Sequence, residues 1–379
     1  MSAIARVLPL LENAPPNPGS VVAGFDGFID EMITLVAERQ SLEEFKPVAD
    51  IGSFGALVSA AAGRSSLREI VVNAIHPGGC AVNLGFGLAA LGVPVDCFAT
   101  LGEPRHPAFD GAAKQFRSVH SWGREPGRTL AFEFSDGKLM YSSVSQLQEF
   151  TAEDVRHRLQ NDAFQTACAE ARVIALTDWT LYPHMTSVWQ LLLQEVFSQL
   201  QHQPNFFFDL VDPSSRSAND IRAMLKILPT FKPCGPVTLG LNGNEANILA
   251  RLTGLREAPP HRDDVLQLAR DLRTRLQLTT IVIHCNNFAV AAGDDDDAAV
   301  DSPHCAHPVK STGAGDRFNA GHIFGLLLNG ELEQCITLGC ATAGLFVRTA
   351  ESPTRETLTE FLHAWDAGLQ ENTPFKKSA

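Results

Sequence analysis

The chain is most informative in the stretch Lys310-Ser311-Thr312-Gly313-Ala314-Gly315-Asp316-Arg317-Phe318-Asn319-Ala320-Gly321. Small residues precede an acid, and an apolar helical pattern follows over Asp316–Leu328. Glycines let backbone N–H groups approach an anion, and the N-terminus of a helix adds its positive dipole. A carboxylate beside a bound phosphate can take a proton from an attacking hydroxyl. The stretch therefore indicates a phosphate site with Asp316 as candidate general base, while a helix cap with an acidic first turn is the structural alternative.

Small and polar residues gather at three other places where a predicted strand ends. The three stretches are Gly24-Phe25-Asp26-Gly27-Phe28-Ile29-Asp30, His76-Pro77-Gly78-Gly79-Cys80-Ala81-Val82-Asn83 and Leu239-Gly240-Leu241-Asn242-Gly243-Asn244-Glu245-Ala246. Paired glycines permit close backbone approach to a ligand, and Asn83 can both donate and accept hydrogen bonds, although a tight turn explains the same residues. A carboxylate at a strand end commonly faces the ligand crevice of an α/β sheet. Asp26 and Asp30 are thus each able to hold sugar hydroxyls, with a turn role favoured for Asp26 beside Gly27.

The third of these stretches places Asn242 and Glu245 at a strand-to-helix junction, with two residues between them. An amide and a carboxylate there suit a hydrated Mg²⁺, because this ion keeps its waters and touches few protein groups. A helix cap followed by an acidic first turn gives the same pattern without a metal. Both interpretations stay open from the sequence.

Short apolar runs alternate with longer helical patterns along the chain. The strand-like runs are Ser20–Ala23, Val93–Ala99, Val173–Thr177, Asn205–Leu210, Val237–Leu241 and Thr280–Ala292. The helix-like segments between them are Val82–Leu91, Ala152–Thr166, Met185–Leu200, Asp263–Leu276 and Asp316–Leu328. Strands that alternate with helices predict βαβ units and a largely parallel sheet.

Two regions depart from this alternation. Arg128–Val144 predicts two strands around Ser135-Asp136-Gly137-Lys138, because an Asp-Gly turn is typical of a hairpin. A hairpin inside a parallel α/β chain is a candidate lid. The other region is Glu38–Ile75, which carries small residues at Gly52–Gly63 and admits either an inserted helix or a mobile segment.

Composition excludes several classes of function. Lys and Arg number 30 against 43 Asp and Glu, so the net charge of −13 disfavours nucleic acid or an anionic membrane as partner. No apolar run approaches the ~18 residues of a membrane helix, and Ala3–Leu11 makes a poor secretory signal, so we expect a cytoplasmic protein. The eight cysteines form no C-x-x-C pair, which predicts free thiols. The acidic run Asp294–Asp297 favours a solvated turn over a cation site, because adjacent like charges repel unless they are exposed.

Together these segments resemble the ribokinase-like, PfkB-type carbohydrate kinase family. They follow the family's order: an early substrate Asp, a Gly-Gly…Asn segment, an N-x-x-E, and G-A-G-D before the C-terminal helices. Phe208–Arg216 resembles the family's D-P-x-x-R strand end, and Ala341–Pro353 resembles the helix and turn that close its nucleotide site. The resemblance implies one ribokinase-like domain over residues 1–379, a doubly wound and mainly parallel sheet flanked by helices, with a small β lid at about 128–144.

The resemblance also implies a reaction and a site. The protein would be a Mg²⁺-dependent kinase that transfers the terminal phosphoryl group of a nucleotide, with ATP favoured over ADP, to a hydroxyl of a sugar or related small molecule. Asp316 would be the base, and the anion hole would use the N–H groups of Gly313, Ala314 and Gly315. The residues implied for the acceptor are Asp30, Gly78, Gly79 and Asn83. The residues implied for the nucleotide are Asn242, Glu245, Thr312, Gly313, Gly315 and Gly339. Asn242 and Glu245 would hold Mg²⁺ through water, and a homodimer formed through the lid is one expected assembly.

Four features depart from the family pattern. Lys310 stands where the family often has an Asp that helps to hold a monovalent cation, so we predict activity that does not depend on K⁺. His284-Cys285-Asn286 replaces the usual T-x-G and resembles the ADP-dependent sugar kinases of the same superfamily. The segment Gly102–His106 replaces a common motif beside the acceptor site, so the acceptor cannot be named by analogy. Arg317 replaces a small residue, and it either touches donor phosphates or faces solvent.

Three other functions are alternatives to this one. A nucleoside kinase of the same fold would place stacking side chains in the acceptor pocket, where the sequence cannot locate Phe28, Phe132 or Phe134. A non-catalytic binding protein on the kinase fold would need no base at Asp316. A nicotinamide-dependent oxidoreductase would require G-x-G-x-x-G after the first strand, where Gly24–Gly27 supplies only G-x-x-G.

Overall fold

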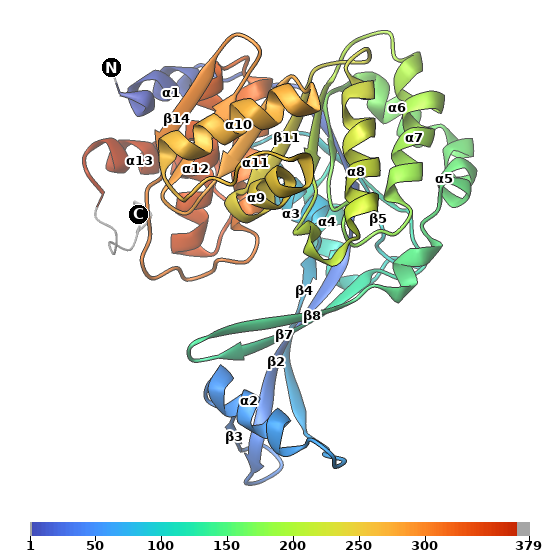
Figure 1. Ribbon diagram of the computed structural model, residues 1–379, viewed down its shortest axis with the longest axis vertical. Helices are drawn as coiled ribbons and strands as arrows, with labels where there is room; N and C mark the ends of the chain where they lie inside the picture. The colour runs from blue at the N-terminus through green and yellow to red at the C-terminus, as the bar shows by residue number, and fades with distance from the viewer. Residues whose placement is uncertain (1, 370–379) are drawn as a thin grey trace.

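The computed structural model describes residues 2–369, and a nine-stranded sheet forms the centre of the protein (Figure 1). The strand order is β14-β13-β12-β11-β10-β9-β1-β5-β6. The strands are β1 Ser20–Phe25, β5 Val95–Ala99, β6 Ser118–Ser121, β9 Ala171–Leu176, β10 Asn205–Asp209, β11 Val237–Asn242, β12 Thr280–His284, β13 Phe288–Ala292 and β14 Asp297–Asp301. In this order, each strand from β12 through β11, β10, β9, β1 and β5 to β6 pairs in parallel with the next. Strands β13 and β14 add two antiparallel strands at one edge. The predicted, mainly parallel α/β sheet is confirmed.

Helices cover both faces of this sheet, because a parallel sheet has to be buried on each side. One layer contains α5 Ala152–Arg158, α6 Ala163–Glu170, α7 Met185–Glu195, α8 Ala218–Ile227, α9 Gly243–Thr253 and α10 Arg262–Leu276. The other contains α1 Ala3–Glu12, α3 Cys80–Ala90, α4 Asp110–Gln115, α11 Ala314–Leu327, α12 Leu332–Thr349 and α13 Arg355–Asp366. Side chains alternate between the two apolar cores, so Val22 of β1 packs in the first and Val21 in the second. No helix in residues 2–369 is long and apolar enough to cross a membrane.

Two predicted elements are wrong in their extent. Thr280–Ala292 is two antiparallel strands, β12 and β13, because the chain turns at Cys285–Asn287. The predicted helix Ala152–Thr166 divides into α5 and α6, because Asp162 adopts a left-handed φ of 55° that interrupts the helical backbone. The acidic run Asp294–Asp297 is exposed, as expected of a solvated turn.

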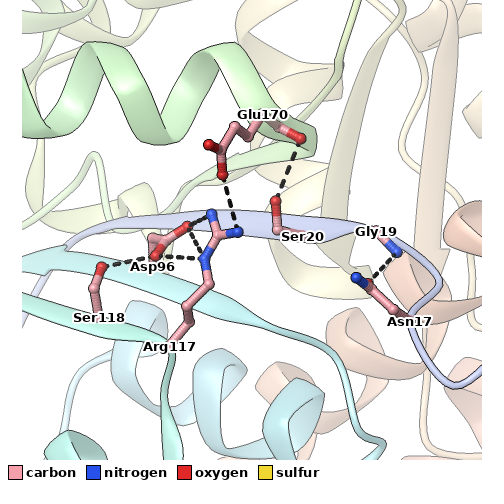
Figure 2. Close-up of polar contacts among 7 residues, drawn as sticks. All are labelled: Asn17, Gly19, Ser20, Asp96, Arg117, Ser118 and Glu170. Atoms are coloured by element: carbon pink, nitrogen blue, oxygen red, sulfur yellow. Dashed lines mark hydrogen bonds and ion pairs between the residues drawn. The ribbon is translucent and has the colours of Figure 1, made fainter.

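A network of ion pairs and hydrogen bonds stabilises the sheet at the end where β1, β5 and β6 begin (Figure 2). Asp96 of β5 is only 3% exposed, and both of its carboxylate oxygens accept from Nε of Arg117 at 3.0 Å. The hydroxyl of Ser118 donates to the same carboxylate at 2.7 Å. Nη1 of Arg117 also donates to the Glu170 carboxylate at 3.1 Å, and Ser20 of β1 donates to the Glu170 carbonyl at 3.4 Å. The network joins β1, β5 and β6 to the end of α6, which gives it a structural role.

A second sheet, here called the outer sheet, projects from the body at the bottom of Figure 1. Its five strands are β2 Phe28–Arg39, β3 Phe45–Pro47, β4 Ile70–Gly78, β7 Gly127–Phe134 and β8 Gly137–Ser143. The hairpin anticipated at 128–144 is β7 and β8. The undecided segment Glu38–Ile75 supplies β3, helix α2 (Ile51–Ala60) and most of β4, and Phe54 of α2 stacks on the ring of Phe134 at 5.6 Å.

Two of the connections between the outer sheet and the body touch each other, namely β1 to β2 and β4 to α3; β6 to β7 and the segment after β8 join them as well. β1 ends at Phe25 and β2 begins at Phe28, so only Asp26 and Gly27 separate a body strand from an outer one. β4 ends at Gly78, and α3 begins after Gly79. Gly79 has a φ of 97°, and a Cβ there would lie 2.6 Å from the carbonyl oxygen of Asp26, so only glycine fits.

Candidate active site

The candidate site lies where the carboxyl ends of β1, β9, β10 and β11 meet the N-termini of α3, α9 and α11. Ligands of open α/β sheets bind outside this end of the strands. Each strand contributes a polar side chain at or just beyond its last residue, namely Asp26, Asp178, Asp209 and Asn242. The topology therefore collects polar residues that are far apart in the sequence.

The glycine turn before α11 has the shape that the sequence predicts. Gly313 is the N-cap of α11 and has a φ of 85°, a left-handed conformation that glycine adopts without strain. The N–H of Ala314 donates to the carbonyl of Ser311 at 3.1 Å. The N–H of Ala314, expected in the anion hole, thus makes a hydrogen bond within the turn. The N–H groups of Gly313 and Gly315 remain the predicted donors of the anion hole.

Asp316 lies in the first turn of α11 and is 9% exposed. Burial raises the pKa of its carboxyl to about 7, and the negative charges of Asp209 and Asp26 act in the same direction. The positive charge of Arg317 and a hydrogen bond with Cys80 oppose the rise. A carboxyl with this pKa is half ionised near neutral pH, which is the condition for efficient general-base catalysis.

Asp26 is completely buried and is bonded to the start of α3. Its carboxylate accepts from the N–H groups of Cys80 and Ala81, the latter at 2.9 Å, and from the hydroxyl of Thr177 at 2.6 Å. The N-cap Gly79 has no side chain, so Asp26 supplies the cap from another element. These bonds occupy Asp26 and support the choice of Asp30 as the acceptor ligand.

A cavity of about 670 Å³ separates the outer sheet from the body. Its lining includes Asp30, His76, Asn83, Lys138, Lys310 and Thr312. Burial raises the pKa of the Asp30 carboxyl, while a hydrogen bond from Thr129 and the charge of Lys310 oppose this. Arg128, the second residue of β7, is exposed, and its Nε lies 2.7 Å from the Glu31 carboxylate. We call this space the acceptor cavity.

Gly78 and Gly79 stand beside the acceptor cavity but do not line it. A Cβ on Gly78 would lie 2.5 Å from a carboxylate oxygen of Asp30. The two glycines therefore allow β4 and α3 to approach the carboxylates closely, and their expected contact with the acceptor remains a prediction.

Asn242 and Glu245 form a capping box at the start of α9. Oδ1 of Asn242 accepts from the N–H groups of Asn244 at 2.9 Å and Glu245 at 3.0 Å, and Oε2 of Glu245 accepts from the N–H of Asn242 at 2.8 Å. Glu245 is 5% exposed, and burial with the charges of Asp209, Asp212 and Asp316 raises its pKa to about 8. Within residues 2–369, no three acidic, His or Cys side chains are placed to bind a metal directly. The helix cap is present, and a metal role through water remains a prediction.

Two adjoining cavities on the other side of the glycine turn are candidates for the nucleotide. One, of about 390 Å³, is lined by Ser311, Ala314, Gly315, Phe318 and Gly344 among others. The other, of about 620 Å³, includes Asn242 and Gly243 in its lining. Both cavities are lined by His284, Cys285 and Asn286, so they form one region, here called the nucleotide region. Burial lowers the pKa of His284 to about 4, so this histidine is neutral at physiological pH.

Gly339 does not line the nucleotide region. A Cβ there would lie 2.8 Å from the ring of Phe318, so this glycine serves the packing of α12 on α11. Cys340, Ala343 and Gly344, in the next turn, line the cavity instead. Gly339 thus lies on the face of α12 that packs against α11, and a nucleotide role for this helix remains a prediction.

Sequence reasoning did not assign a role to two buried acids at the site. Asp209 accepts from the N–H of Val211 at 3.0 Å and from the amide of Asn319 at 2.7 Å. Asp178 accepts from the N–H of Leu181 at 3.0 Å and is 1% exposed. Burial raises the pKa of both carboxyls. An acid at the end of successive parallel strands was the signal available in the sequence.

Comparisons with known proteins agree with this geometry. Residues 6–365 match the model of the family described as prokaryotic ketohexokinase. A ketohexokinase of Haloferax volcanii is 27% identical over 348 residues, which cover 90% of each chain. A ribokinase structure from Arabidopsis thaliana, complexed with ribose and ATP, has a TM-score of 0.60 at 17% identity and covers 91% of this chain and 98% of its own. A nucleoside kinase from Burkholderia thailandensis in complex with inosine has a TM-score of 0.58 at 14% identity and covers 92% and 99%. The chain therefore belongs to the prokaryotic ketohexokinase family and is a carbohydrate kinase with the ribokinase fold.

Proposed function

We propose that the enzyme transfers the terminal phosphoryl group of ATP to a hydroxyl of a ketohexose, with Asp316 as general base. The observation that carries this proposal is the position of the glycine turn. Ser311 lines both the acceptor cavity and the nucleotide region, and Asp316, five residues further along the chain, is buried in the first turn of α11 with a pKa of about 7. A base close in sequence to a turn that borders both ligand spaces fits a direct transfer from donor to acceptor.

In this mechanism the protein positions the reactants and stabilises charge. Asp30 and Asn83 orient the acceptor hydroxyls from the cavity wall. Asp316 takes the proton of the attacking hydroxyl, and the N-terminus of α11 faces the transferred phosphoryl group with the N–H groups of Gly313 and Gly315. Thr312, which lines the acceptor cavity, borders the same group.

Mg²⁺ fits the surplus of buried carboxylates at the site. The pKa of Glu245 is raised by burial and by neighbouring acids, so a divalent cation nearby would offset a repulsion that the folded protein otherwise retains. Asn242 and Glu245 would hold it through water molecules. When bound, Mg²⁺ neutralises charge on the donor phosphates.

A ketohexose is preferred over a nucleoside as acceptor. The relative from Haloferax volcanii is a ketohexokinase, and the family model has the same description. Phe134 is the one phenylalanine in the described lining of the acceptor cavity, with His76 as the other aromatic ring, while Phe28 is buried in the core and Phe132 packs near Phe54. A nucleobase would need more stacking surface than this lining offers.

The outer sheet is proposed to close over the acceptor and to support a homodimer. Closure would exclude water, which competes with the sugar as nucleophile. Strand β4 pairs only with β2, so its other edge is unpaired, and Ile70, Val72 and Ile75 are between 42% and 52% exposed. An unpaired edge strand with exposed apolar side chains favours association with a second copy.

Kinase assays with the purified protein test the proposal. Fructose, other ketohexoses, aldoses and nucleosides are incubated with ATP or ADP in the presence of Mg²⁺ or EDTA, and nucleotide turnover is measured. We expect ATP-dependent turnover of a ketohexose that needs Mg²⁺ and is lost in Asp316→Asn. Turnover that survives this substitution would remove Asp316 from its role, and preferred turnover of a nucleoside would replace the proposed acceptor.

A further inference from the structure

Arg317 follows the base in α11 and is buried to an unusual degree for an arginine, at 6% exposed. Two contacts hold its guanidinium group. Nε donates to the hydroxyl of Ser352 at 3.0 Å, and the group lies over the ring of Phe346 at 4.7 Å from its centroid. Phe346 belongs to α12, so the orientation of Arg317 is fixed by a neighbouring helix and the turn after it.

One end of this guanidinium group has no partner. Nη1 of Arg317 is buried and donates to no atom of the protein in the described part of the chain. A buried donor without an acceptor is costly, and natural proteins retain one mainly where a ligand or ordered water completes it. Arg317 also forms no salt bridge with a carboxylate within residues 2–369, although Asp316 lies close enough to influence it.

The direction of Nη1 follows from its distance to the glycine turn. An ideal Cβ built on Gly313 would lie 3.5 Å from Nη1 of Arg317 and 3.7 Å from Nδ2 of Asn83. Two side-chain donors from different helices therefore converge beside the residue that begins α11. Asn83 lines the acceptor cavity, so this point lies at the side from which the acceptor arrives.

We infer that Nη1 of Arg317 and the amide of Asn83 bind the phosphoryl group while it passes from the nucleotide to the acceptor. This inference rests on the proposed function and adds a further catalytic residue to it. The acceptor oxygen forms a bond to the terminal phosphorus, the bond from that phosphorus to the bridging oxygen of ADP breaks, and the hydroxyl proton passes to Asp316. Arg317 neither gains nor loses a proton, and its charge offsets the charge on the phosphoryl oxygens.

Lys310 is less suited to this role. It lines the acceptor cavity, but it is exposed, and its ammonium group lies 5.7 Å from the centroid of the same Phe346 ring. A flexible exposed ammonium loses more conformational entropy on binding than a guanidinium group that is already fixed. Arg317 is the cation that its contacts with Ser352 and Phe346 already hold beside the glycine turn.

Four variants of the full chain test the inference, the fourth being Arg317→Ala for the rescue by guanidinium ion described below. Arg317→Met removes the charge with little change of volume, Arg317→Lys retains a charge without the fixed geometry, and Ser352→Ala is the matched control that removes the Nε contact only. For Arg317→Met we expect a loss in kcat of about 10²–10³-fold, the cost of removing one donor to a transition-state oxygen. We expect the Kd of ADP with Mg²⁺ to change by less than about threefold, because Nη1 is directed to the transferred group and not to ADP.

Calorimetry with ADP, Mg²⁺ and aluminium fluoride gives a readout that a merely structural role would not move. This anion mimics the transferred phosphoryl group, so we expect it to tighten ADP binding in the wild-type enzyme. We expect the tightening to be lost in Arg317→Met and retained in Ser352→Ala. Guanidinium ion in low millimolar amounts should restore part of the kcat of Arg317→Ala, which also controls for misfolding.

The inference is overturned if Arg317→Met retains the aluminium fluoride effect, or if both Arg317→Met and Ser352→Ala lose kcat equally with parallel losses of thermal stability. Failure of the proposed function gives a different pattern. In that case the wild-type enzyme shows no ketohexose turnover with ATP, while the difference in anion binding between wild type and Arg317→Met still decides the role of Arg317.

Discussion

Replacing Asp209 by Asn should move the pH dependence of the reaction. Asp209 lies at the end of β10, and its negative charge contributes second after burial to the raised pKa of Asp316, which is about 7. Asparagine retains the size of the side chain and an oxygen that can accept from Val211. The substitution therefore removes a charge next to the proposed base, Asp316, with little change in shape.

The expected magnitude follows from the ionisation of Asp316. With a pKa of about 7, the fraction of ionised base falls about tenfold for each pH unit below neutrality, so kcat/KM of the wild-type enzyme falls in proportion. Removal of one nearby like charge lowers a carboxyl pKa by roughly one unit. In Asp209→Asn the acidic limb of the profile should shift downward by that amount.

The assay is kcat/KM for the ketohexose between pH 5 and 9 at constant ionic strength, for wild type, Asp209→Asn and the exposed control Asp271→Asn. The reasoning is refuted if the acidic limb of Asp209→Asn coincides with that of wild type while the protein remains folded. It is also refuted if Asp271→Asn shifts the limb equally, because the effect would then come from net charge alone.

Three further predictions concern stability and ion dependence. Arg117→Met should lower the free energy of unfolding in urea by about 2 kcal/mol without changing kcat, because Asp96 stays buried without its cation while Arg117 itself is partly exposed; an unchanged midpoint would contradict this. Activity should be equal within about twofold in K⁺ and Na⁺ at matched ionic strength, because the ammonium of Lys310 replaces the cation electrostatically, and strong K⁺ stimulation would exclude that. His322 is fully buried, neither ring nitrogen has a partner within the described chain, and burial lowers its pKa to about 4, so the unfolded state binds more protons between pH 6.5 and 4. The contribution of neutral His322 to the free energy of unfolding is therefore present above pH 6.5 and is lost as the pH falls from 6.5 to 4, by up to about 3 kcal/mol. The variant His322→Leu should show a weaker dependence of this free energy on pH, measured by urea unfolding at several pH values.

Local sequence signals were enough to predict the turns and helix starts of the candidate site. The glycine turn before Asp316, the capping box of Asn242 and Glu245, and the Asp-Gly hairpin are each specified by neighbouring residues. Their physical causes, namely positive φ, helix capping and turn geometry, act over a few residues. This is why they could be found without a structure.

Tertiary contacts determined what the sequence could not show. Strand β2 was missed because it leaves the body and its 12 residues show no regular alternation: the first two side chains are buried and the last three are exposed. The role of Asp26 as the cap of α3 depends on a contact with a segment 54 residues away. The free end of Arg317 depends on Phe346 and Ser352, and no local pattern around the glycine turn signals those partners.

The narrow junction between β1 and β2 has a mechanical consequence. Asp26 is hydrogen-bonded to α3 and Gly27 packs against Thr100, so a rotation of the outer sheet would have its fulcrum, or hinge, at Asp26 and Gly27. β2 has 12 residues, so its tip lies ~40 Å from that fulcrum, whereas Asp30 lies only ~10 Å away. A rotation of ~10° would sweep the tip through ~7 Å and displace Asp30 by less than ~2 Å at these strand dimensions. In the proposed closure, such a long arm would open a wide entrance while the carboxylate of Asp30, the proposed acceptor ligand, stays almost in place.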